Sequence, residues 1–270
     1  MTLFAPDYYN KFTCIADKCK NNCCIGWEID IDDDTLKFYK TKGDIINNID
    51  SSPSPHFRLK ENERCPFLNS NNLCEIIKNY GEERLCQICR DHPRFRNFFI
   101  SRTEIGLGMC CEAATDLIIN NDFSLIKLDT EKEIPNQEEK AFFELRESVL
   151  SKMPEDFSYL LPDLSLNDIY NLLISMEKLS DSRDEILSIL KDDFRKIKEI
   201  KLFNKQAFKR IFDYLVFRHL HSEDLAFCVL CTYIIASLGE DIKENARMFS
   251  SEIEYSEENT DILYESAIKF

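Results

Sequence analysis

Cysteine is the residue type in this chain whose number and spacing most clearly indicate chemistry. Twelve cysteines occur in 270 residues, and ten of them precede residue 112. Four crowd into the stretch CIADKCKNNCCIGW, which also holds the only tryptophan. In chain order the cysteines are Cys14, Cys19, Cys23, Cys24, Cys65, Cys74, Cys86, Cys89, Cys110, Cys111, Cys228 and Cys231. Such thiols can form disulfides, bind zinc or carry an iron–sulfur cluster.

The spacing of these cysteines favours a cluster over zinc. Structural zinc is usually held by two Cys-x2-Cys pairs, and in the first half of the chain only Cys86 and Cys89 have that spacing. Adjacent cysteines such as Cys23 and Cys24 point in divergent directions and rarely bind one ion, whereas iron–sulfur clusters accept more varied spacings. His92 stands beside a proline, where we expect a hydrogen-bonded turn residue rather than a ligand.

Charge and the N-terminal residues restrict the surroundings of the protein. The 49 acidic side chains outnumber the 34 basic ones, which argues against a nucleic-acid partner or an anionic membrane surface. The residues MTLFAPDYYNKF lack the features of a signal peptide, and no stretch approaches eighteen consecutive apolar residues. We therefore expect a cytoplasmic protein, in which thiols stay reduced and metal binding is favoured over disulfides.

The patterns of common nucleotide and protease sites are missing from the sequence. The sole G-x-G is Gly106-x-Gly108, which has no third glycine, so a Rossmann pocket is not expected. Neither a Walker loop nor an H-E-x-x-H sequence occurs. Any small-molecule site must therefore be built in another way.

Composition divides the chain into a cysteine-rich region, 1–125, and a helical region, 126–270. The boundary is placed where LDTEKEIPNQ carries charges and a proline but no periodic apolar pattern. We expect a mainly α protein, with an irregular metal-binding N-terminal half that contains short strands and a C-terminal helical bundle. Cys228 and Cys231 lie in the apolar stretch AFCVLCTYII, where both are expected to pack in the core.

The elements that carry the first ten cysteines are predicted to be short. Alternation of apolar and acidic residues in WEIDI predicts a strand, and Asp32–Asp34 provide an N-cap for a helix that runs towards Gly43. The stretch CPFLNSNNLCEI is typical of a tight hairpin that turns at residues 69–72. NFFISRTEIGLGM predicts a strand pair before a helix that begins near Glu112.

The second region shows helical periodicity. Apolar spacings of three and four predict helices near 142–153, 165–179, 182–197, 204–216 and 224–238. Ser165 with Asp168 resembles a capping box, Asn204 is expected to cap the fourth of these helices, and Gly239 is expected to end the fifth.

Three stretches of the first region, taken together, resemble a known family. They are FTCIADKCKNNCCIGWEIDID, CPFLNSNNLCEIIKNYGEERLCQICRDHPR and GLGMCCEAA. In this order they resemble the flagellin lysine-N-methylase (FliB) family, and the cysteine frame is similar to that of zinc- or iron-chelating cysteine cluster proteins. The resemblance covers roughly the first 120 residues.

The resemblance implies an enzyme that methylates lysine side chains of flagellin, with S-adenosylmethionine as methyl donor and a [4Fe-4S] cluster. It implies that the metal ligands are Cys14, Cys19, Cys23, Cys24, Cys65, Cys74, Cys89 and Cys110. Cys86 and Cys111 depart from the family pattern, so the resemblance does not assign them as ligands.

Three polar residues inside the family-like stretches are candidates for the chemistry. Asp30 and Glu112 are candidate catalytic acids or bases, and Arg94 is a candidate to bind the donor's carboxylate through its guanidinium fork. Ordinary structural roles are the favoured alternative for each residue taken alone: Asp30 and Glu112 as first-turn or capping acids, and Arg94 as an internal hydrogen-bond bridge. Two other functions remain open: a zinc-stabilised protein-binding module, and an iron–sulfur or metal-handling protein without methyltransferase activity.

Overall fold

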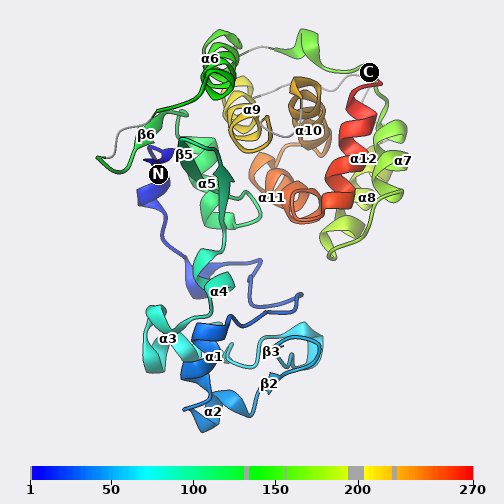
Figure 1. Ribbon diagram of the computed structural model, residues 1–270. Helices are drawn as coiled ribbons and strands as arrows, with labels where there is room; N and C mark the ends of the chain where they lie inside the picture. Colours follow the sequence, from blue (N-terminus) through cyan, green and yellow to red (C-terminus); the bar gives the residue numbers. More distant parts are fainter. Residues whose placement is uncertain (1, 131–133, 156, 194–203, 221–223, 270) are drawn as a thin grey trace. The chain divides into compact units, whose positions relative to one another are not determined.

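The structure is a computed structural model that describes residues 2–130, 134–155, 157–193, 204–220 and 224–269 (Figure 1). Contacts divide the chain into two units. Unit 2 comprises Thr13–Phe95, and unit 1 comprises Met1–Phe12 together with Arg96–Phe270. The compositional boundary near residue 126 lies within unit 1. The expectation of a mainly α protein is confirmed, since the described residues contain twelve α-helices and only short strands.

Unit 2 is built from short elements joined by loops. Its helices and strands are α1 (Asp33–Tyr39), α2 (Gly43–Ile46), β2 (Ile49–Asp50), β3 (His56–Phe57), α3 (Glu75–Tyr80) and α4 (Gln87–Asp91). The strand predicted for WEIDI does not form, because the facing strand is only two residues long and Asp30 makes just an isolated antiparallel bridge with His56. The alternation of burial is present, with Ile29 and Ile31 buried and Glu28 and Asp30 exposed. Asp32 caps α1 as predicted, with its side chain accepting a hydrogen bond from the backbone N–H of Thr35.

The sheet of unit 1 has the strand order β4-β5-β1-β6. These strands are β4 (Arg94–Phe98), in which the chain passes from unit 2 to unit 1, β5 (Arg102–Leu107), β1 (Thr2–Pro6) and β6 (Leu125–Lys127). β1 pairs with β5 in parallel, with Phe4 opposite Glu104, and with β6 in antiparallel orientation, with Ala5 opposite Ile126. The predicted strand pair before the helix at Glu112 is confirmed as β4 and β5.

Helices make up the rest of unit 1. They are α5 (Glu112–Asn120), α6 (Gln137–Lys152), α7 (Leu166–Ile174), α8 (Ser182–Asp193), α9 (Lys205–His219), α10 (Leu225–Ser237), α11 (Ile242–Ile253) and α12 (Glu257–Ala267). The predicted caps at Ser165 and Asn204 are confirmed, as is the end of α10 before Gly239, which has a left-handed φ of 100°. Part of the helix predicted for 182–197 falls on residues 194–197, outside the described residues.

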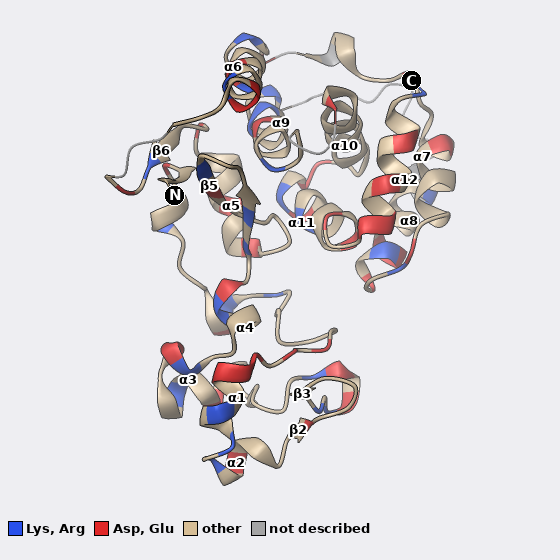
Figure 2. Cartoon of the chain, viewed as in Figure 1, with Lys and Arg blue, Asp and Glu red and all other residues tan. Residues whose placement is uncertain are grey.

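Helix α10 is the centre of the helical part. None of the residues Leu225–Ser237 is charged, so most of the helix is tan in Figure 2, and it packs against α9, α11 and α12. Cys228 and Cys231 on this helix are fully buried, which confirms the prediction that both belong to the core. Among the described residues, no helix is long and apolar enough to cross a membrane.

Candidate metal centre

Six thiols of unit 2 lie close enough together for the charge or hydrogen bond of one to change the pKa of another. They are Cys23, Cys24, Cys65, Cys74, Cys86 and Cys89, and we call them the thiol group. All twelve cysteines of the chain are present as thiols. Residues from three separate stretches of sequence are thus gathered in one unit.

One isolated β-bridge joins the first stretch to the second, and another closes the second stretch on itself. Ile25 forms an antiparallel bridge with Arg64, and the N–H of Cys65 donates to the carbonyl of Cys24 at 2.9 Å. Leu68 forms a second bridge with Cys74, which closes the predicted hairpin. The hairpin turns at residues 69–72 because the side-chain oxygen of its first asparagine accepts two backbone N–H groups, at 2.9 and 3.0 Å. The two bridges place Cys24, Cys65 and Cys74 near one another.

The third stretch enters through helix α4. Cys86 occupies the N-cap position of α4, and its Sγ lies 3.4 Å from the Sγ of Cys89, one turn further along. Asp32, the cap of α1, also accepts a hydrogen bond from the N–H of Gln87 at 2.7 Å. This single carboxylate therefore holds the N-termini of α1 and α4 together, 55 residues apart in sequence.

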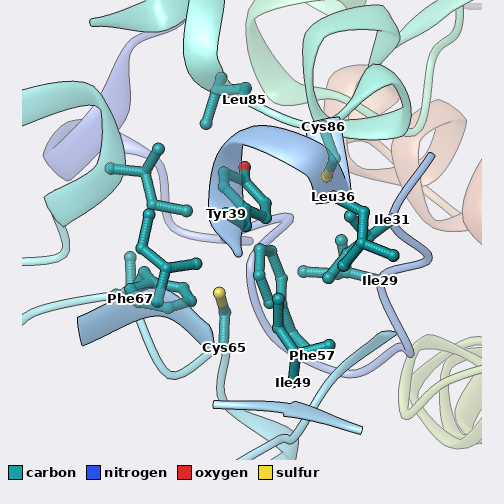
Figure 3. Packing of buried hydrophobic residues seen from close by; sticks show 13 residues of the cluster. Ile29, Ile31, Leu36, Tyr39, Ile49, Phe57, Cys65, Phe67, Leu85 and Cys86 are labelled. Carbon is teal, nitrogen blue, oxygen red and sulfur yellow. The ribbon is translucent and has the colours of Figure 1, made fainter. Parts of the chain in front are cut away.

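Apolar side chains contact five of the six thiols, all except the exposed Cys23. Cys65 and Cys86 are members of the buried cluster of unit 2, as Figure 3 shows, together with Tyr39, Phe57 and Phe67. The hydroxyl of Tyr39 donates to the carbonyl of Arg84 at 2.8 Å. Cys24, Cys74, Cys89 and Trp27 are partly buried and pack against the same cluster. A low-polarity surrounding of this kind strengthens electrostatic interactions within the thiol group.

The adjacent thiols of Cys23 and Cys24 have pKa values that are shifted in opposite directions. A hydrogen bond from Cys24, helped by His92, lowers the pKa of Cys23 to about 4, although burial opposes this shift. The hydrogen bond to Cys23 and burial raise the pKa of Cys24. The contact with His92 was not foreseen from the sequence, which predicted only a turn residue. The lowered pKa favours the thiolate form of Cys23, the form in which cysteine binds metals.

Burial makes Cys65 and Cys74 reluctant to ionise in the absence of a cation. It raises the pKa of Cys65 to about 11 and also raises the pKa of Cys74. The hydrogen bond between Cys86 and Cys89 lowers the pKa of Cys86 and raises that of Cys89. Buried thiolates need a compensating positive charge, which a metal ion or cluster supplies.

The thiol group fits a metal or cluster in donor chemistry and in grouping. In the described part of the chain, however, no three His, Cys, Asp or Glu side chains are already arranged around a single point at metal-ligand distances.

The remaining predicted ligands lie elsewhere. Cys14 and Cys19 belong to the loop that precedes the thiol group: Cys14 Sγ accepts from the N–H of Ala16 at 3.4 Å, and Cys19 Sγ donates to the carbonyl of Asn21 at 3.3 Å. Cys110 belongs to unit 1, where burial raises the pKa of its thiol to about 12. Its Sγ lies 3.1 Å from the hydroxyl of Tyr255.

The three polar candidates have ordinary partners in the structure. Asp30 is exposed and accepts a hydrogen bond from Ser54 Oγ at 3.2 Å. Arg94 donates from Nη1 to the carbonyl of Arg90 at 3.0 Å. Glu112 is the first residue of α5, and its Oε1 lies 4.0 Å from Nζ of Lys243. Their proposed roles in catalysis stay predictions.

A buried polar network in unit 1 was not foreseen from the sequence. Glu254 Oε1 lies 2.6 Å from Nε2 of His219 and 3.1 Å from the hydroxyl of Tyr214. Arg218 donates to that hydroxyl at 2.7 Å, and its guanidinium lies 5.1 Å from the ring of Tyr255. The network thus reaches the tyrosine that contacts Cys110. The sequence signal that could have predicted this network is the pair Arg218 and His219 at the end of the apolar helix α9.

Comparison with known proteins identifies relatives. A lysine-N-methylase of Salmonella typhimurium is 27% identical over 135 residues, which are 45% of this chain and 33% of the relative. The resemblance to the lysine-N-methylase family is confirmed. A lysine-N-methylase of Salmonella choleraesuis matches to the same extent. The flagellar biosynthetic protein FliU of Salmonella muenchen is 25% identical over 133 residues, which are 45% of this chain and 79% of FliU.

The relationship to the lysine-N-methylases is partial. The chain matches about a third of the length of the two methylases, at 33% of each. No family model matches the chain, and no solved structure matches it.

Proposed function

We propose that this chain is a protein-lysine N-methyltransferase that acts on flagellin, takes its methyl group from S-adenosylmethionine and carries a [4Fe-4S] cluster. One observation carries the proposal: a chain similar to lysine-N-methylases gathers six thiols in one unit. We further propose that it works in the cytoplasm, where these thiols stay reduced. Neither nucleic acid nor membrane is proposed as a partner.

The ligands are proposed to come mainly from the thiol group. Cys65 belongs to the apolar cluster of unit 2, Cys24, Cys74 and Cys89 pack against it, and the pKa of Cys23 is lowered. Cys14, Cys19 and Cys110 complete the set that the family resemblance implies. When bound, the cluster would cross-link the loops and supply Lewis-acidic iron.

The methyl transfer sets clear demands on the protein. The lysine nitrogen attacks the methyl carbon, the carbon–sulfur bond breaks with its electron pair going to sulfur, and the nitrogen then releases a proton. The lysine must arrive neutral, which requires desolvation or a nearby base. Glu112 is the proposed base, and the proposal is supported by the 4.0 Å distance between its Oε1 and the ammonium nitrogen of Lys243. Asp30 is a second candidate base, and Arg94 is a candidate for the donor's carboxylate.

The test is methyl transfer itself. Anaerobically purified chain is incubated with flagellin and S-adenosylmethionine that carries a deuterated methyl group, and the flagellin is digested and analysed by mass spectrometry. We expect labelled methyl groups on lysine side chains, and none when Cys89→Ala replaces the wild type. Unlabelled flagellin in both reactions would contradict the proposal.

A zinc-stabilised protein-binding module is the second candidate function. It is favoured by the 3.4 Å distance between the Sγ atoms of Cys86 and Cys89. Two thiolates on a tetrahedral zinc ion lie about 3.8 Å apart, since each Zn–S bond is about 2.3 Å. Stoichiometric zinc without sulfide in the purified protein would support this function.

A further inference from the structure

Unit 1 contains a cavity that none of the roles described above uses. Its volume is about 480 Å³, and it lies among β5, the residues around the start of β6, α6 and α9. The residues that give it chemical character are Arg102, Phe123, Phe143, Arg146, Glu147 and Asp213. Pockets of about 300–1,000 Å³ are typical of small-molecule sites, so this cavity can hold a nucleoside-sized ligand.

Two buried guanidinium groups form part of the lining. Arg102 is 7% exposed and Arg146 is 3% exposed. Both contact the fully buried Glu104: Nη2 of each lies 2.5 Å from its Oε1, and Nη1 of Arg146 donates to Oε2 at 2.8 Å. The shared carboxylate holds the two planar groups in place, as a site for a ligand carboxylate requires.

Acidic groups balance these cations. Asp213 lies 2.5 Å from Nζ of Lys209, and burial raises its pKa to about 6, which leaves it ionised at neutral pH. Glu147 adds a second, exposed carboxylate. The lining therefore carries two cations and two anions, a balance that disfavours a polyphosphate and suits a zwitterion.

Aromatic rings supply flat apolar surface beside these charges. The guanidinium of Arg102 lies 3.3 Å from the ring centroid of Phe143, and the ring of Phe123 lies 5.2 Å from that of Phe217. Rings of this kind stack on a nucleobase or face a sulfonium cation.

We propose that this cavity binds a zwitterionic nucleoside, the methyl donor S-adenosylmethionine, with the arginines towards its carboxylate, the acidic groups towards its ammonium and the phenylalanines beside its base. This inference rests on the proposed function, because the methyltransferase reaction requires that donor. It gives the donor a location in unit 1 and assigns its carboxylate to Arg102 and Arg146 in place of Arg94, which is not part of the lining.

The experiment fills the cavity from its exposed walls. Ser151 on α6 and Ser124 before β6 both line the cavity and are exposed, so Ser151→Trp and Ser124→Trp introduce bulk without disturbing a core. Lys152→Trp is the matched control, since this exposed neighbour of Ser151 is not part of the lining. Binding of S-adenosylmethionine, S-adenosylhomocysteine and ATP to the full chain is measured by calorimetry, and circular dichroism checks the fold of each variant.

We expect the wild type to bind both adenosyl compounds more tightly than ATP. Each serine variant should weaken that binding by about tenfold or more, and the control variant by less than about twofold. Unchanged affinity in both folded serine variants, or tighter binding of ATP, would overturn the assignment of the cavity. Flagellin methylation is assayed in parallel. If the serine variants bind S-adenosylmethionine normally and still methylate flagellin, only the assignment of the cavity is refuted. If binding depends on the cavity but the wild type does not methylate flagellin, only the proposed function is refuted.

Discussion

The Sγ atoms of Cys86 and Cys89 lie 3.4 Å apart at the start of helix α4, within the same unit as four other interacting thiols. Cys86 is fully buried, although the family resemblance does not assign it as a ligand. A buried pair of neighbouring thiols is stable while one partner keeps its proton, and both ionise only when a cation arrives. The pair is therefore the part of unit 2 whose state depends most directly on bound metal.

Removal of a thiol from unit 2 should release the metal. Cys89→Ala is expected to lower bound iron and sulfide to background, because Cys89 interacts with both Cys24 and Cys65. Cys231→Ala is the control: this core residue should cost about 1 kcal/mol of stability and leave the iron content unchanged. Metal analysis of both purified variants checks the prediction, and equal iron in the two would count against the thiol group as the ligand source.

Asp32 accepts hydrogen bonds at the start of both α1 and α4, so its loss should weaken the retention of metal by the thiols of α4. Asp32→Ala removes the hydrogen bonds to Thr35 and Gln87 and is expected to cost about 1–2 kcal/mol, the usual range for loss of a cap. It should also release iron faster to a chelator, because the start of α4 carries Cys86 and Cys89. Asp33→Ala, one residue further along, is the matched control and should show neither effect. Identical chelation rates in the two variants would show that the cap does not hold the thiols.

The buried network of unit 1 should make stability depend on pH. Burial alone would raise the pKa of Glu254, but the charge of Arg218 and the contact with His219 lower it to about 2. A carboxyl group whose pKa is depressed in the folded state stabilises fully above its unfolded value near 4.5 and loses this contribution as the pH falls towards 2. The full contribution is roughly 3 kcal/mol at neutral pH.

Glu254→Gln tests this dependence. The variant should be less stable than the wild type near neutral pH, and the difference should narrow by about 1 kcal/mol between about pH 6.5 and about pH 3.5. Urea unfolding at both pH values provides the measurement. Glu257→Gln on the exposed first turn of α12 should follow the wild type at both. A gap for Glu254→Gln that stays constant or widens on acidification would contradict the assigned pKa shift.

Local patterns in the sequence were sufficient for several elements. The capping box of Ser165 and Asp168, the cap at Asn204 and the turn at residues 69–72 were predicted because their hydrogen bonds join residues close in sequence. The burial of Cys228 and Cys231 followed from the uniform apolarity of α10. In each case one short window contains all the atoms that decide the outcome.

Contacts between residues far apart in the sequence could not be predicted from short stretches of it. Asp32 reaches Gln87 across 55 positions, and Cys110 reaches Tyr255 across 145. The approach of His92 to Cys23 depends on how the loops of unit 2 fold back, which spacing does not encode. Cysteine spacing predicted that thiols would gather, and the structure adds which of them share a unit.

The metal content of the anaerobically purified wild type tests the proposed iron–sulfur cluster on the thiol group. Iron, acid-labile sulfide and zinc are assayed on one sample whose visible absorption spectrum is also recorded. We expect iron with matching sulfide and a broad visible band that disappears in Cys89→Ala. Stoichiometric zinc without sulfide, in a colourless protein, would contradict the proposed cluster and would favour the zinc-stabilised binding module.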